Sequence, residues 1–355
     1  MSSKKIAVRR RNAGADRSFR LSAIYCLLPA VCWLSSPALA QRTVYQLPAA
    51  GDTLYFKADV CLWGRAHALQ ETDYMPWTPA TRSENSFDRA IGYTGVSLQF
   101  GQYLQSRVMF DVGDITGRPI HDLFAAASWR GLDLRVGQFK PPTGYENLTA
   151  HWRVDFVDGT MLSGLRTPTG MTRDIGAQLA YNHEWFQTAL AVLNGNGRNQ
   201  PKDNNRFKDV AYRLIATPLG NTSPLFLGGN LYLGSDTLAR DTANEPFRRF
   251  AGEFGWVNPG YFVRAEFMKG SDAAGGVNGM YVAAGFRVRD IQPVVRFERV
   301  VAERPNLAVS VLTIGLNGFF VQDRVKPMLD FSWASDKVKE IETFKLALQL
   351  QVAFW

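Results

Sequence analysis

The sequence contains little cysteine and few long apolar stretches. Three cysteines occur in 355 residues, and Cys26 and Cys32 lie in an N-terminal segment that we expect to be removed. Cys61 is then alone and cannot form an internal disulfide, which excludes a disulfide-stapled secreted domain. After the apolar stretch at 21–34, no segment reaches the 18 apolar residues that a transmembrane helix requires, so no such helix is predicted.

Residue patterns that carry catalysis or bind metals are also missing. The chain has four histidines, and none forms an H-x-x-x-H pair of the kind that binds zinc on a helix. There is no G-x-S-x-G nucleophile elbow and no phosphate-binding P-loop. We therefore expect no catalytic residues, no metal and no cofactor, and we predict that the protein is not an enzyme.

Most of the excess positive charge belongs to the N-terminus. The net charge is +8, but residues 1–40 hold seven basic residues and one acid, so residues 41–355 carry only +2. This small excess does not indicate nucleic-acid binding. A basic flank, a short apolar stretch and Ala38-Leu39-Ala40 together are typical of a secretory signal. We predict that residues 1–40 are a signal peptide, cleaved after Ala40.

Alternation of apolar and polar residues dominates the rest of the chain. In the last segment, Phe344, Leu346 and Leu348 alternate with Lys345 and Gln349. Sixteen such segments follow one another, from 53–63 to 343–355. Most are about ten residues long, which is the length of a tilted membrane-spanning strand. This pattern predicts β-strands that are apolar on one face only.

The lengths of the connections also depend on strand order. Connections after even-numbered strands are short, as at 258–259, whereas those after odd-numbered strands tend to be longer, as at 195–206 and 270–276. This sorting is typical of an outer-membrane barrel with both termini in the periplasm. We predict an all-β fold, a 16-stranded antiparallel transmembrane β-barrel at 53–355. A short periplasmic segment at 41–52 precedes it, and the barrel is expected in the outer membrane of a Gram-negative bacterium.

The longest informative connection, 140–172, follows the fifth strand and is predicted to fold into the barrel as its third loop. It can narrow the pore, or it can be a structural plug whose arginines pair with Asp155 and Asp158.

The inward strand faces hold ten basic and nine acidic residues. These charges can form stiffening ion pairs, as Asp133/Arg135, Arg264/Glu266 and Arg296/Glu298 suggest, or a transverse field across the pore. Basic residues at the narrowest point would select anions. The candidates for this constriction are Lys140, Arg153, Arg166, Arg173, Arg107 and Arg135.

Three stretches resemble the phosphate- and polyphosphate-selective outer-membrane porins. They are VGQFKPPTGYE at 136–146, RDIGAQL at 173–179 and LNGNG at 193–197. The resemblance implies a sixteen-stranded barrel, usually a homotrimer, with an inward third loop and basic residues that guide anions. The arginine ladder of that family has no counterpart that can be placed residue by residue in this chain.

These observations predict a porin, a water-filled channel for passive diffusion. Its expected partners are small anionic solutes such as phosphate, outer-membrane lipid and two further copies of the chain in a homotrimer; no nucleic acid is expected. Two alternatives remain open at this stage. One is a plugged barrel with a structural or adhesive role, and the other is a barrel enzyme of the outer membrane.

Overall fold

The computed structural model describes residues 47–49, 52–70, 83–113, 117–170, 172–203, 207–220, 223–235, 245–304 and 306–354, with side chains from Gly92 onward except at His151 and Phe354. The predicted signal peptide and most of the segment 41–52 lie outside the described residues. Helical structure in the described part is limited to α2 (Tyr145–Leu148) and the 3-10 turns η1 (His151–Arg153) and η2 (Ser163–Leu165). No helix among these residues is long and apolar enough to cross a membrane.

The remaining regular structure is β-strand. The strands are β1 (Leu47–Ala49), β2 (Asp52–Gln70), β3 (Ser83–Phe100), β4 (Leu104–Asp111), β5 (Ile120–Trp129), β6 (Leu132–Phe139), β7 (Asp174–Asn182), β8 (Phe186–Leu193), β9 (Asp209–Ala216), β10 (Leu225–Ser235), β11 (Pro246–Val257), β12 (Tyr261–Asp272), β13 (Gly275–Phe286), β14 (Ile291–Ala302), β15 (Leu307–Gly318), β16 (Val325–Asp336) and β17 (Ile341–Phe354).

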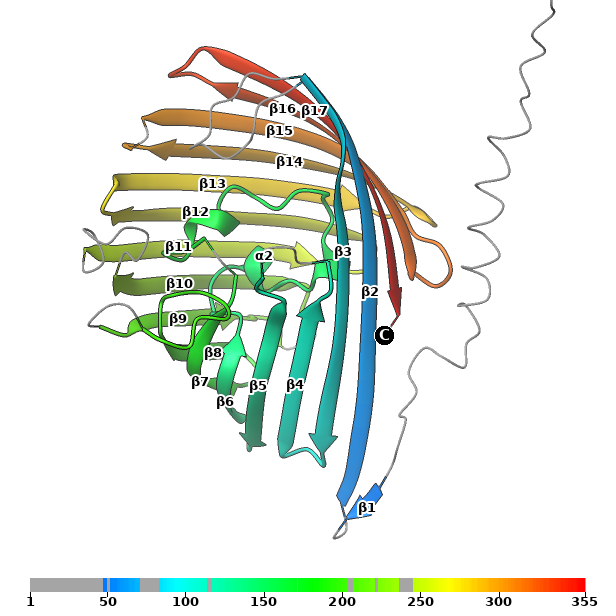
Figure 1. The fold of residues 1–355 in the computed structure, drawn as a ribbon, viewed down its shortest axis with the longest axis vertical. Helices are drawn as coiled ribbons and strands as arrows, with labels where there is room; N and C mark the ends of the chain where they lie inside the picture. The colour runs from blue at the N-terminus through cyan, green and yellow to red at the C-terminus, as the bar shows by residue number, and fades with distance from the viewer. Residues whose placement is uncertain are drawn as a thin grey trace, which may run out of the picture. The chain divides into compact units, whose positions relative to one another are not determined.

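The hydrogen-bonded strands form a closed circuit, in which the last strand pairs with β2. Each strand from β2 to β17 pairs antiparallel with the next, including β9 with β10, and β17 pairs with β2. The three-residue strand β1 adds a short pairing at the start of β2. The strands curve around a common interior, as Figure 1 shows. The prediction of a sixteen-stranded antiparallel barrel is confirmed, and a closed circuit satisfies the backbone groups that lipid cannot.

The outer face of the barrel is apolar. In β17, Leu346, Leu348 and Leu350 are exposed, whereas Ala347 and Gln349 between them are buried. The same alternation recurs around the sheet, so an exposed apolar band faces outward and polar side chains face inward. This is the arrangement expected where the solvent outside the barrel is lipid.

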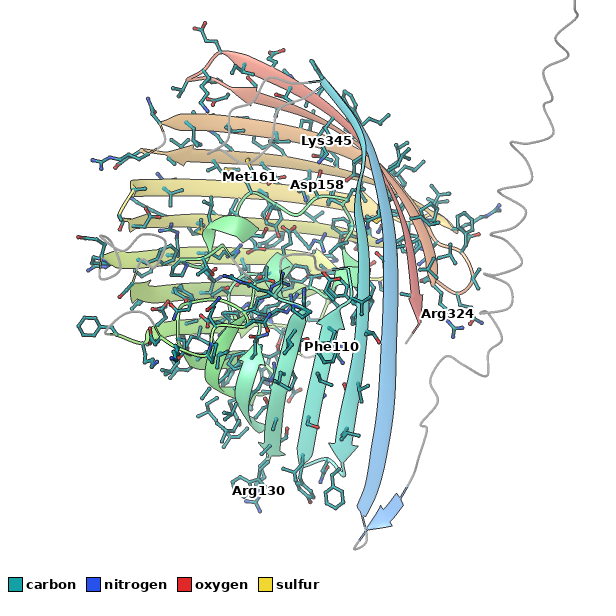
Figure 2. The ribbon with its side chains drawn as sticks, in the orientation of Figure 1. Phe110, Arg130, Asp158, Met161, Arg324 and Lys345 are labelled. Carbon is teal, nitrogen blue, oxygen red and sulfur yellow. The ribbon has the colours of Figure 1, made fainter. Side chains whose placement is uncertain are left out.

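Aromatic residues mark the end of the barrel that carries the short turns. The exposed side chains here include Tyr103, Trp129, Trp185 and Tyr261. The indole Nε1 of Trp256 donates a hydrogen bond to the Tyr261 hydroxyl at 3.0 Å. Amphipathic rings of this kind lie at a membrane–water interface. Figure 2 labels Arg130 and Arg324, which belong to turns of this end.

Several connections at the opposite end are shorter than predicted. The segment 270–276 was expected to be a loop, but β12 runs to Asp272 and β13 begins at Gly275. Likewise β2 continues to Gln70 and β3 begins at Ser83. The long connection predicted at 64–91 is therefore mostly strand. Strands that leave the lipid keep their hydrogen bonds but have water on both faces. Their apolar–polar alternation therefore fades before the strands end.

Topology can be tested with two inserted tags. A peptide tag at 199–203 lies in the connection between β8 and β9, at the end with the longer loops, and should be labelled by antibody on intact cells. A tag at 258–259, in the turn between β11 and β12, should be labelled only after the outer membrane is permeabilised. Labelling of the second tag alone on intact cells would reverse the orientation of the barrel.

Candidate functional site

The connection between β6 and β7 folds into the barrel and is held by wall side chains. The backbone N–H of Val157 donates to Asp330 at 2.7 Å, and that of Met161 donates to Glu298 at 2.8 Å. The side-chain amide of Gln351 donates to the Trp152 carbonyl at 2.9 Å. These contacts join the loop to β14, β16 and β17, and the segment that carries α2 lies within the curve of the sheet in Figure 1. The predicted inward third loop is confirmed.

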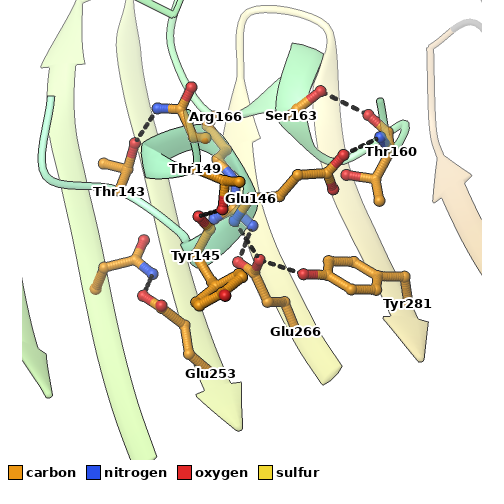
Figure 3. Close-up of polar contacts among 12 residues, drawn as sticks. Thr143, Tyr145, Glu146, Thr149, Thr160, Ser163, Arg166, Glu253, Glu266 and Tyr281 are labelled. Carbon is orange, nitrogen blue, oxygen red and sulfur yellow. Dashed lines mark hydrogen bonds and ion pairs between the residues drawn. The ribbon is translucent and has the colours of Figure 1, made fainter. Parts of the chain in front are cut away.

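A buried ion pair holds the loop on β12. The Arg166 guanidinium, only 2% exposed, donates to Glu266. The same carboxylate accepts hydrogen bonds from the Tyr281 hydroxyl at 2.6 Å and from the backbone N–H of Glu146 at 3.1 Å, as Figure 3 shows. Glu146 in turn accepts from the backbone N–H of Thr160 at 2.8 Å. One wall carboxylate thus fixes two parts of the loop, 120 and 100 residues away in sequence.

A glycine makes this arrangement possible. Gly144 precedes α2 with a φ of 69°, which is favourable only for glycine. A Cβ at this position would lie 2.2 Å from the Arg166 Cζ atom. The backbone can therefore pass directly over the guanidinium only where no side chain intervenes.

Loop acids pair with basic residues of the wall. Asp155 accepts from Arg264 at 2.6 Å, and Asp158 pairs with Lys345 at 2.8 Å. Figure 2 labels Asp158, Met161 and Lys345, which lie close to one another inside the sheet. The plug interpretation expected loop arginines on these two acids, but these contacts run from loop to wall instead.

Two of the three within-strand pairs suggested by the sequence form ion pairs, and the one between Asp133 and Arg135 is the longer at 3.8 Å. Arg296 and Glu298 are 2.7 Å apart. Arg264 and Glu266, in contrast, each bind the loop. Much of the charge on this side of the wall therefore serves to hold the loop.

Most anchors of the loop lie on β11 to β17, and a cavity of about 450 Å³ lies on the other side of the barrel. Residues of β4 to β9 form its wall, and the loop closes it from the inside. Five basic side chains line it, whereas Asp122 is the single acid among its described lining residues. The basic residues are Arg107, Arg135, Lys140, Arg173 and Arg213.

Four of the six candidate residues therefore meet in one place. Arg107, Arg135, Lys140 and Arg173 line the cavity. Arg166 is elsewhere, buried against Glu266 on the opposite side of the loop. Arg153 is exposed and does not line this cavity.

Two charged lining residues were missing from the candidates. Alternation in β9 makes Arg213 an inward-facing residue, but nothing in the sequence places it near the loop. Asp122 lies beside a register shift at Met109/Phe110 in the pairing of β4 with β5. The shift disturbs the alternation by which an inward residue is recognised.

The five cations differ in how far carboxylates neutralise them. Arg173 and Arg107 share Asp122, at 3.0 and 3.5 Å. Arg213 binds Glu253 through two nitrogens, the shorter distance being 2.6 Å. The carboxylate of Asp133, by contrast, is 3.8 Å from Arg135, beyond hydrogen-bonding distance.

Lys140 is held by the loop itself. Its ammonium donates to the Thr149 carbonyl at 2.7 Å. Burial, reinforced by the charge of Arg173, lowers the pKa of Lys140 to about 7, and Asp122 and Glu146 oppose the shift only partly. The charge of this lysine therefore changes near neutral pH.

Known structures show the class of fold. No protein-family model and no curated protein matches the chain. An anion-selective porin from Comamonas acidovorans is 9% identical with a TM-score of 0.66, covering 85% of this chain and 100% of the porin. OmpF of Salmonella typhi, in complex with daunomycin, is 12% identical with a TM-score of 0.64, covering 87% and 100%.

A third structure has the same fold. It is the outer-membrane channel DcaP of Acinetobacter baumannii, which is 8% identical with a TM-score of 0.58 and covers 85% of this chain and 97% of the channel. The chain thus has the barrel fold of outer-membrane porins. This fold, the closed circuit of strands and the apolar outer band place it in the outer membrane of a Gram-negative bacterium.

Proposed function

We propose that this chain is a porin through which small anions diffuse passively, and that the cavity between the loop and β4–β9 is the constriction. The observation that carries the proposal is the lining of that cavity, with five basic residues against one acid. A fixed positive potential where the path is narrowest lowers the free energy of an entering anion and raises that of a cation. Arg107, Arg135, Lys140 and Arg173 are the proposed selectivity residues, with Arg213 added.

The sequence resemblance suggests phosphate as the solute and a homotrimer as the assembly. The arginines support an oxyanion, since a guanidinium can give two parallel hydrogen bonds to one phosphate or carboxylate. The plugged-barrel alternative is less well supported, because most anchors of the loop lie on β11 to β17 and leave the cavity beside β4–β9. We further propose that the chain is not an enzyme.

Reversal potentials in a salt gradient across a planar bilayer test this proposal. The parent channel should prefer chloride over potassium. Arg135→Ala should lower that preference about fivefold, because a unit charge 4 Å from the ion is worth ~1 kcal/mol in water. Arg153→Ala removes the same charge from an exposed loop position outside the cavity and should leave the potential unchanged. A parent that prefers potassium would refute the proposal.

A further inference from the structure

The cavity that we assign to the constriction is lined by two kinds of side chain. Its basic residues come from β4, β6 and β9 and from the two ends of the loop. The loop between these ends contributes apolar residues, and further apolar residues of the wall complete the lining. The principal members of this apolar set are Pro142, Leu148, Ala150, Trp152, Phe124 and Phe139. A channel built only for hydrated inorganic ions has no use for such a surface, because an ion with its water gains nothing from contact with it.

Arg135 is placed to bind an anion in this cavity. Its guanidinium lies over the Phe124 ring, 4.4 Å from the centroid, and 6.0 Å from that of Phe139. The side chain is 28% exposed, and its Nε is buried without a hydrogen-bond partner. A guanidinium that stacks on a ring still has its N–H groups free to donate in its own plane. A carboxylate accepts two such parallel hydrogen bonds.

The cavity also has the size of a small-molecule site. Its volume of about 450 Å³ lies within the ~300–1,000 Å³ typical of such sites. A planar organic acid could place its carboxylate at Arg135 and cover the apolar loop residues with its ring. Inorganic phosphate would reach the same donors but leave Leu148 and Trp152 uncovered.

We infer that the constriction is a binding site for organic anions with a flat apolar body, such as aromatic monocarboxylates, in preference to inorganic phosphate. This inference rests on the proposed function, because it names the solute class for the same cavity. It assigns two tasks to different residues. Arg135 and its basic neighbours bind the carboxylate, and Leu148 and Trp152 recognise the apolar body.

Single-channel recording with three added anions tests the inference. Benzoate, acetate and phosphate are added separately to the full-length channel in a planar bilayer at pH 7, and the reduction of the chloride current is followed against concentration. Benzoate should halve the current at a concentration about tenfold lower than acetate or phosphate. Acetate carries the same carboxylate without the ring, so the ratio of benzoate to acetate isolates the apolar contact.

Variants separate the two tasks. Leu148→Ala should bring benzoate close to acetate, because the apolar contact is lost while the carboxylate site stays. Arg135→Ala should weaken benzoate and acetate alike. Trp152→Ala is a second test of the apolar contact and should lower the ratio of benzoate to acetate in the same way. Trp185→Ala, at the exposed turn end, is the matched control and should behave as the parent. Heat-modifiable migration in gels shows which variants are folded.

Three results would overturn the inference. Phosphate could act at the same or lower concentration than benzoate, benzoate could equal acetate in the parent, or the ratio could survive Leu148→Ala in a folded channel. Failure of the proposed function has a different signature, a parent channel without chloride preference in a salt gradient. The two failures are therefore distinguishable in the same recordings.

Discussion

Replacing Glu266 with glutamine is expected to give a channel at least twice as conductive as the parent and less selective for anions. The carboxylate holds Arg166, Tyr281 and the backbone of Glu146 together. Glutamine has nearly the same shape but no charge, so the Arg166 guanidinium would be buried without its counter-ion. Breaking a buried pair in this way costs about 3–5 kcal/mol. Release of the segment around α2 into the lumen's water is the favourable response, and it widens the path beside the loop.

A matched control lies on the neighbouring strand. Glu253 of β11 faces Glu266 of β12 in the pairing register and is similarly buried, but its partners Arg213 and Asn230 belong to the wall. Glu253→Gln removes the same charge without a loop contact, so it should not raise the conductance twofold, and because Arg213 then loses its counter-ion at the cavity, the anion preference should not fall. Single-channel recordings of both variants provide the measurement. Equal conductance in parent and Glu266→Gln would mean that the remaining anchors alone hold the loop.

The second large effect is on pH dependence, through Lys140. Burial lowers the pKa of this residue to about 7, so it is charged at pH 6 and largely neutral at pH 8. Anion preference should therefore be greatest below pH 6 and should fall as the pH rises through 7. Reversal potentials measured between pH 5.5 and 8.5 follow this change. Loss of one unit charge near the path should reduce the preference by about fivefold at ~4 Å in water.

Two substitutions at the same position identify the titrating group. Lys140→Arg keeps its charge across this pH range, so the anion preference should stay high at pH 8. Lys140→Met has no charge, so the preference should stay low at pH 6. If Lys140→Arg retained the pH dependence of the parent, another group would have to be responsible.

The sequence predicted the strands well because lipid imposes a strict rule on one face of each. Outward positions such as Leu348 and Leu350 must be apolar, and a period of two is easily recognised. The rule stops at the membrane surface. Beyond it, β2 and β12 continue as paired strands with no apolar face, and their ends could not be located from alternation.

The candidate site was predictable only in part for a different reason. Inward-facing Arg107 and Arg135 follow from alternation, and Lys140 and Arg173 border the loop in sequence. The docking of the loop depends on Arg166 and Glu266, which are 100 residues apart. No local pattern shows that a hydrogen-bonded wall carboxylate neutralises Arg166, whereas Asp133 stays 3.8 Å from Arg135. The apolar role of Leu148 and Trp152 was missed for the same reason, since it exists only once the loop faces the wall.

The uneven strand lengths have a consequence for the surrounding lipid. Strands β4 and β6 to β9 have eight or nine residues, whereas β11 to β16 have twelve. At ~3.4 Å per residue and a tilt of roughly 45°, these lengths span about 19–22 Å and about 29 Å of membrane thickness. An apolar layer of about 25 Å fits within the tall wall but exceeds the short one.

Lipid beside β4 to β9 must therefore thin locally, at a cost of fractions of a kcal/mol per ångström. Another copy of the chain placed against the short wall would remove lipid from that position and with it the cost. The difference in height thus favours assembly through β4–β9, the same wall that carries Arg107, Arg135 and Arg213.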